Sequence, residues 1–300
     1  MNTRKTKKIN EIKCQNVGTI TIQESHFTKK GKLKIENFET FEAIRKKQNG
    51  GTIIGINKAL NPMLIKDYSD EFELVVVEIK LHNKEIRIIS GYGPQETWSE
   101  AETLPFFVAL EEEIVKAGLL GVSVIIEMDS NSKLGRHFIP LDPHEQSANG
   151  KVLAGIIERN NLVVANGLNA KCVGAITRRR VTSKSTEESI IDHVIISCDI
   201  EQYLESILID EEGHHSLTKI FKNKNGLITR KSDHNTILSK FNFTWKRNKT
   251  SNRIEMYNLK NTENQKTFKE ITSNSTNNDL NKATNIFAKV LFSYLNSGKH

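Results

Sequence analysis

The chain has 300 residues, of which 37% are hydrophobic and 26% are charged, and its formal net charge is +7. A chain of this length and composition can bury a substantial core and is typical of a globular protein. No apolar run reaches the ~18 residues needed to cross a bilayer, and the N-terminus lacks an apolar signal core, so we expect no membrane association and an intracellular location, nuclear in a eukaryotic cell.

Residues 1–92 are predicted to hold one helix followed by strands. The basic segment 3–16 favours the helix. Short apolar runs and alternating polar and apolar residues predict the strands, in chain order, at 17–24, 38–46, 52–57, 73–81 and 85–92. The short His82–Asn83 turn joins the last two, which is typical of a hairpin.

Residues 103–243 mix helices with further strands. Apolar residues at three- and four-residue steps predict a helix at 103–117, with Thr103 as its cap, and another at 150–160. The remaining apolar segments predict strands at 121–129, 162–166, 175–178, 189–197, 203–210 and 234–243. Because strands and helices do not strictly alternate, we expect a mixed α/β or α+β fold with two packed sheets covered by helices.

The composition changes from Trp245 onward, where Asn, Thr, Lys and Ser predominate. Such a segment is typical of a weakly folded linker, with helical patches near 253–271 and 280–296. We therefore expect one domain over residues 1–245 and a polar, basic, partly helical tail over 246–300.

The positive charge lies mainly at the two ends of the chain. Residues 1–13 hold five basic side chains and one acidic one, and residues 246–300 hold ten basic and four acidic ones. The body between them is therefore mildly acidic. This pattern is typical of a cation-binding centre flanked by segments that favour a polyanion, although solvated basic ends would produce it too.

The three cysteines lie far apart in the sequence, at Cys14, Cys172 and Cys198. Their number is odd and their spacing matches no zinc site, so we expect neither a disulfide framework nor structural zinc. A reducing compartment fits this cysteine usage.

Acidic, amide or histidine residues follow or precede several predicted strands, and one of them, Asp192, lies inside a predicted strand. These residues are Glu24, Asp129, Asn131, Asp192, Asp233 and His234. Strand ends at one edge of a sheet can converge on one pocket, and a group of carboxylates selects a hard cation such as Mg²⁺ or Mn²⁺.

Each of these residues, taken alone, has a structural explanation. Glu24 can cap a turn, and Asp129 with Asn131 can form an Asx-turn. Asp192 is harder to explain in this way because it interrupts an apolar strand, where a carboxylate needs a partner to offset its burial.

Five short motifs in order resemble the endonuclease/exonuclease/phosphatase family, and in particular its non-LTR retrotransposon endonucleases. They span about residues 10–245 and are IQE at 22–24, SGYGPQ at 90–95, EMDSNSKLG at 127–135, ITR at 176–178 with SIIDHVIIS at 189–197, and SDH at 232–234. The resemblance implies a four-layer α/β sandwich of two mixed β-sheets flanked by helices. No strand ending in asparagine precedes IQE, so the family's first strand is expected to be missing.

The resemblance also implies a magnesium- or manganese-dependent endonuclease that nicks DNA. Glu24 and Asp233 would bind the metal. Asp129 would align or deprotonate the attacking water, and Asn131 would contact the phosphate. The linker-like tail implies fusion to a reverse transcriptase in a longer parent protein, and we expect the chain to be a monomer.

Further roles follow from the same resemblance. Tyr92 would hydrogen-bond the scissile phosphate, and His234, oriented by Asp192, would stabilise the pentacovalent centre. Thr177 and Arg178 would contact the substrate, although the basic loop 178–184 can also be read as simply exposed. Two other functions stay open, namely a non-catalytic relic that binds nucleic acid and a phosphatase of the same fold.

Overall fold

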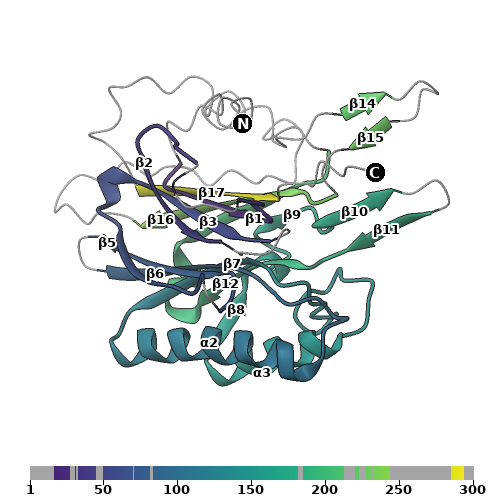
Figure 1. The fold of residues 1–300 in the computed structure, drawn as a ribbon, viewed down its shortest axis with the longest axis horizontal. Helices are drawn as coiled ribbons and strands as arrows, with labels where there is room; N and C mark the ends of the chain where they lie inside the picture. The colour runs from purple at the N-terminus through teal and green to yellow at the C-terminus, as the bar shows by residue number, and fades with distance from the viewer. Residues whose placement is uncertain are drawn as a thin grey trace.

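The computed structural model describes residues 17–27, 31, 33–44, 50–69, 71–81, 84–181, 185–212, 220–222, 228–230, 233–243 and 285–293. Two β-sheets pack face to face, and helices cover the outer face of one of them (Figure 1). The predicted helix at 3–16 and the predicted helical patch at 253–271 lie outside these residues. No helix in the described ranges is long and apolar enough to span a membrane.

The first sheet has six strands and carries most of the candidate site residues. In spatial order its strands are β4 (Met63–Asp67), β5 (Leu74–Leu81), β6 (Lys84–Tyr92), β7 (Ser123–Asp129), β12 (Asp192–Ser197) and β8 (Leu162–Val164). Strands β6 and β7 are parallel, and all other neighbours are antiparallel. The β5–β6 hairpin is the one that the sequence predicts.

The second sheet has seven strands. In spatial order they are β2 (Phe38–Ala43), β3 (Thr52–Asn57), β1 (Thr19–Gln23), β17 (Asn285–Ser293), β16 (Thr236–Phe243), β13 (Leu204–Asp210) and β9 (Cys172–Val173). Two smaller ribbons pair β10 (Arg178–Val181) with β11 (Thr186–Ser189) and β14 (Ile220–Lys222) with β15 (Ile228–Arg230).

Strand β17 corrects the expected helical patch at 280–296. It lies between β1, to which it is parallel, and β16, to which it is antiparallel. The seven-stranded sheet is therefore continuous from β1 through β17 to β16, although the resemblance predicts that the family's first strand is missing. Periodicity did not reveal this strand, because its pairing depends on partners far away in the sequence.

Helices α2 (Glu100–Leu119) and α3 (Ala148–Arg159) cover the six-stranded sheet (Figure 1). Helix α2 begins before the predicted Thr103 cap, because Glu102 accepts hydrogen bonds from the backbone and hydroxyl of Ser99. The Ser147 hydroxyl caps α3 by accepting a hydrogen bond from the amide of Gly150. The described residues also include the short 3-10 helices η2 (Lys58–Leu60), η3 (Ala165–Gly167) and η4 (Cys198–Tyr203).

The segments around residues 175–197 also differ from expectation. The strand predicted at 175–178 is found instead at 178–181, as β10. Of the strand predicted at 189–197, Ser189 ends β11 and residues 192–197 form β12. Strands β10 and β11 form an antiparallel ribbon, with Arg178 opposite Ser189. Strand β4 was not predicted. Strand pairing, rather than local pattern, decides these boundaries.

The main core lies between the two sheets and is mostly aliphatic. It includes Ile54 and Ile56 of one sheet and Val75, Val77 and Ile88 of the other. This apolar layer changes to polar side chains toward the ends of β1, β6 and β7. The packing of the two sheets thus brings these three strand ends together.

Candidate active site

The site begins with three residues that lie side by side in the six-stranded sheet. In the strand register Tyr92 is opposite Asp129 across β6 and β7, and Asp192 is opposite Asp129 across β7 and β12. The fourth residue, His234, comes from the segment just before β16 of the other sheet. The sandwich therefore gathers residues that are distant in sequence, as the strand-end argument predicts.

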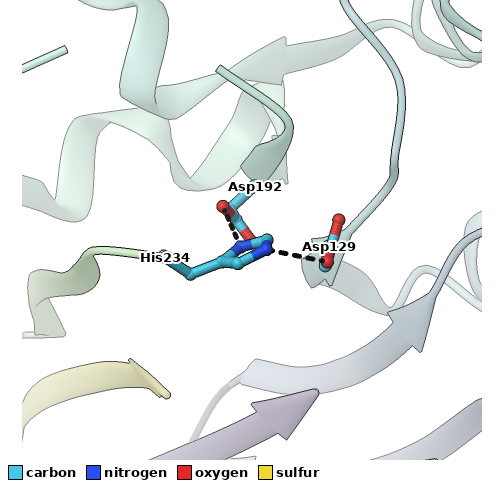
Figure 2. Close-up of side chains that lie close together, drawn as sticks. All are labelled: Asp129, Asp192 and His234. Carbon is cyan, nitrogen blue, oxygen red and sulfur yellow. Dashed lines mark hydrogen bonds and ion pairs between the residues drawn. The ribbon is translucent and has the colours of Figure 1, made fainter. Parts of the chain in front are cut away.

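Asp129, Asp192 and His234 form the centre of the site (Figure 2). The Nδ1–H of His234 donates to the two carboxylate oxygens of Asp192, at 2.9 and 3.1 Å. The opposite ring nitrogen, Nε2, lies 3.8 Å from Oδ2 of Asp129. The exposed fractions are 1% for Asp129, 0% for Asp192 and 8% for His234, so these interactions lie in a low-dielectric environment.

The two carboxylates and the imidazole shift each other's protonation. Burial raises the pKa of Asp129 to about 8, and the negative charge of Asp192 adds to this effect. Burial alone would lower the pKa of His234, but Asp192 and Asp129 outweigh it and raise that pKa to about 10. At neutral pH His234 is therefore a cation held between two acids, and Asp129 is poised to exchange a proton.

Glu24 and Tyr92 form the next part of the site. The Tyr92 hydroxyl donates to Oε1 of Glu24 at 2.7 Å. Burial, followed by the charges of Glu24 and Asp129, raises the pKa of Tyr92 far above its usual range, so its hydroxyl stays protonated. Glu24 has a positive φ of 49° at the end of β1, where the backbone turns out of the sheet.

The turn after β7 is the Asx-turn that the sequence suggests. The backbone N–H of Asn131 donates to Oδ1 of Asp129 at 3.0 Å, and Asn131 has a φ of 49°. The side chain of Asn131 donates to the carbonyl of Gly93 at 2.9 Å. The turn leaves Oδ2 of Asp129 facing His234, so the structural and functional explanations of Asp129 are compatible.

Thr177 is buried, whereas the resemblance predicts that it contacts the substrate. It has no exposed surface, and its hydroxyl accepts hydrogen bonds from the backbone N–H groups of Ile191 and Asp192 at 2.9 and 3.1 Å. A side chain with no exposed surface cannot touch a substrate in this conformation. Thr177 instead holds the backbone that carries Asp192.

Asp233 and Arg178 bind each other at the edge of the site. The Nε and Nη2 atoms of Arg178 each lie 2.9 Å from Oδ2 of Asp233. Both side chains are partly exposed, at 29% for Arg178 and 24% for Asp233. The ion pair keeps the Arg178 guanidinium beside the backbone of His234, with which Arg178 forms an isolated bridge.

Asn166 supports the site but was not singled out from the sequence. It is 4% exposed, its amide donates to the carbonyl of Asp192 at 3.2 Å, and its carbonyl oxygen accepts from the N–H of Val194 at 3.0 Å. Asn166 thus takes the place of a neighbouring strand beside Asp192. An asparagine within an apolar segment is the only sequence signal that could have suggested it.

The residues at the centre suit a hard divalent cation. Ligand atoms of Asp129, Asp192 and His234 lie within 4.8 Å of one another. Within the described part of the chain, Oδ2 of Asp129 is buried and has no hydrogen-bond partner. When both carboxylates are ionised, they outweigh the charge of the protonated histidine and leave a net negative charge, which a divalent cation would offset.

Comparison with known proteins places this site in a recognised fold. No family model and no curated protein matches the chain. Solved structures do match. The endonuclease domain of TRAS1, a telomere-specific non-LTR retrotransposon, is 18% identical with a TM-score of 0.52, covering 78% of this chain and 90% of that domain.

Two further solved structures are similar. The 3′ phosphatase NExo from Neisseria, bound to a product DNA hairpin, is 14% identical with a TM-score of 0.56, covering 80% of this chain and 95% of that one. The AP endonuclease LMAP from Leishmania major is 10% identical with a TM-score of 0.56, covering 77% and 80%. The chain therefore has the mixed α/β fold of the endonuclease/exonuclease/phosphatase proteins. Within that fold class, the similar structures include a retrotransposon endonuclease domain.

Proposed function

We propose that this chain is a divalent-cation-dependent phosphodiesterase that nicks DNA, as an endonuclease of the retrotransposon type does. The observation that carries the proposal is the buried cluster of Asp129, Asp192 and His234 at the strand ends of this fold. The likeness to the TRAS1 endonuclease domain supports the retrotransposon type.

The proposed cation is Mg²⁺ or Mn²⁺. Glu24 and Asp233 are the ligands that we propose from the sequence motifs, and Asp129 is a further candidate because its Oδ2 has no partner among the described residues. The cation, when bound, would polarise a phosphoryl oxygen and offset the charge that develops there. Its binding would also favour the ionised form of Asp129.

The protein side chains have distinct proposed tasks. In its ionised form, which a bound cation would favour, Asp129 would accept a proton from the attacking water. His234 donates a hydrogen bond from Nε2 to a phosphate oxygen, while its Nδ1–H stays on Asp192. Tyr92 and Asn131 supply neutral donors to the same phosphate once their present partners give way.

The proposed substrate surface lies beside β10. Arg178 is the candidate closest to the site, since its guanidinium pairs with Asp233 next to His234. A guanidinium can contact phosphate oxygens of a DNA backbone without reading sequence. The monomeric state, the fusion to a reverse transcriptase and a nuclear location remain predictions of the same proposal.

A plasmid-nicking assay tests the proposal. Supercoiled plasmid is incubated with the purified chain in Mg²⁺, in Mn²⁺ and in excess chelator, and the relaxed form is quantified. We expect relaxed circles with either cation and none with chelator. Salt-sensitive DNA binding without nicking in either cation would instead support the non-catalytic relic.

A phosphatase is the second candidate, and the likeness to the 3′ phosphatase NExo favours it specifically. The two candidates share the same centre, because fold and chemistry do not fix the substrate. An oligonucleotide with a 3′-phosphate separates them. Release of inorganic phosphate, with intact supercoiled plasmid under the same conditions, would assign the phosphatase activity.

A further inference from the structure

Gln23 is a fully buried polar residue that the proposed chemistry does not use. It is the last residue of β1, has an exposed fraction of 0%, and immediately precedes Glu24. Burial of an amide without hydrogen bonds is unfavourable. Within the described residues its amide nitrogen has two hydrogen-bond partners, whereas its Oε1 has none.

The amide nitrogen of Gln23 reaches across the sandwich to the opposite sheet. It donates to Oγ of Ser90 at 3.0 Å and to the backbone carbonyl of Glu127 at 3.2 Å. A backbone carbonyl can only accept, so the nitrogen of the amide must face the six-stranded sheet. The Ser90 hydroxyl is in turn 2.7 Å from the hydroxyl of Thr52 on β3.

The strand positions of these partners matter more than the bonds themselves. Ser90 is two residues before Tyr92 on β6, and Glu127 is two residues before Asp129 on β7. Residues two apart on a strand point to the same face, so Ser90 and Glu127 form the layer next to the site. One side chain therefore links the strand ends that carry Glu24, Tyr92 and Asp129.

We propose that Gln23 is a positioning residue. It holds the two stacked sheets in the relative position that places Glu24 against Tyr92 and near Asp129. The inference rests on the proposed function, since it concerns the same centre. The Glu24–Tyr92 hydrogen bond joins the two sheets at 2.7 Å, and a small slip between the sheets would lengthen it. Misplacement of a reacting group by about 1 Å can lower turnover by about 100-fold.

The test compares two buried substitutions on one strand face. Gln23→Met keeps the length of the side chain and removes its hydrogen bonds. Thr21→Val is the matched control, because Thr21 is equally buried on the same face of β1 and its hydroxyl has no hydrogen-bond partner in the described ranges. Thermal unfolding of both variants establishes that each is folded at the assay temperature.

Two readouts are measured on the full chain, namely nicking kinetics and the affinity for Mn²⁺ alone by titration calorimetry. For Gln23→Met we expect kcat to fall by about 10- to 100-fold with little change in KM, and Mn²⁺ affinity to fall by about 10-fold. Thr21→Val should match the wild type in both.

The outcomes separate this inference from the proposed function. A wild type that binds Mn²⁺ but cleaves no substrate would reject the nuclease, and the Mn²⁺ affinities of the two variants would still decide the role of Gln23. The positioning role is overturned if Gln23→Met keeps wild-type Mn²⁺ affinity. It is also overturned if Thr21→Val loses as much affinity or turnover as Gln23→Met.

Discussion

Two buried charged clusters lie in the six-stranded sheet, and they differ in how well their charges are matched. One joins β5 and β6 to helix α2 through Arg87, Glu78 and Glu113. The other is the candidate site around Asp129, Asp192 and His234. Both contain ionised side chains with almost no exposed surface, yet only one of them is fully paired.

The Arg87 cluster satisfies its charges internally. Arg87 donates to Glu78 at 2.6 and 2.8 Å and to the carboxylate of Glu113 at 3.2 Å. Tyr68 and Lys116 donate to the other oxygen of Glu113 at 2.9 and 3.0 Å. Two cations thus face two carboxylates, which is the arrangement that lets a buried ion pair persist.

The site cluster is left unbalanced. Two acids share one histidine, Oδ2 of Asp129 has no hydrogen-bond partner in the part of the chain that is described, and burial raises the pKa of Asp129 to about 8. A group held in an unfavourable state is typical of a functional site. We infer that the matched buried charges around Arg87 stabilise the fold, whereas the unmatched charges around Asp129 are poised to bind a ligand or a proton.

The largest expected effect is on turnover, from His234→Ala. Removal of the imidazole takes away both the phosphate donor and the partner of Asp192, so nicking should fall by about 10³-fold or more. The rate is measured on supercoiled plasmid under single-turnover conditions. His137→Ala is the control, because the His137 side chain is 80% exposed, and equal losses in both variants would contradict the assignment.

The next largest effect is on stability, from Arg87→Met. Loss of the guanidinium leaves Glu113 and Glu78 buried without their cation, which should lower the free energy of unfolding by about 3 kcal/mol. Urea unfolding measures this. Lys80→Met removes an exposed ion pair with Glu85 and should leave stability essentially unchanged, because solvent screens that pair. If Arg87→Met had the same free energy of unfolding as the wild type, the Arg87 cluster would not stabilise the fold and the contrast with the candidate site would be wrong.

A smaller loss is expected for Tyr92→Phe. The variant keeps the ring and removes only the hydroxyl that donates to Glu24, so kcat should fall by about 10-fold while the fold stays intact. Tyr203→Phe offers a control, since Tyr203 lies at the other end of the sandwich beside Phe243. Unchanged kcat in Tyr92→Phe would remove Tyr92 from the candidate site.

The smallest expected effect is a gain in stability from Asp129→Asn. The folded protein raises the pKa of Asp129 from 3.8 to about 8, so the ionised carboxylate destabilises the fold increasingly as pH rises through this window. Asparagine carries no charge, and the melting temperature should rise by a few degrees. The gain should be larger at pH 8 than at pH 5 without added cation. A lower melting temperature at both pH values would contradict the cause given for the pKa shift.

The sequence could predict much of the site but less of its surroundings. Glu24 and Asp129 each stand at the end of an apolar strand and Asp192 interrupts one, which are patterns that local periodicity reveals, and their convergence follows from stacking two sheets. The Arg178–Asp233 pair and the burial of Thr177 could not be predicted. The pair depends on the contact between β10 and the segment before β16, and Thr177 bonds to Ser189 at the end of β11. Strand β17 was misread as helix for a similar reason, since its partners lie far away in the sequence.

Gln23 illustrates the same limit. Its place in the IQE motif was visible, but its hydrogen bonds to Ser90 and Glu127 depend on the register between two sheets. Sequence pattern can mark a polar residue at a strand end. It cannot show which residue of the opposite sheet that side chain meets.

The most direct test of the central claim compares the two clusters in one experiment. Magnesium-dependent nicking of supercoiled plasmid is measured for the wild type, Asp129→Ala and Arg87→Met, with each rate expressed per folded molecule. We expect near-complete loss of nicking in Asp129→Ala and a wild-type rate in Arg87→Met. Equal rates in all three proteins would contradict the claim that the unbalanced cluster is the reacting centre.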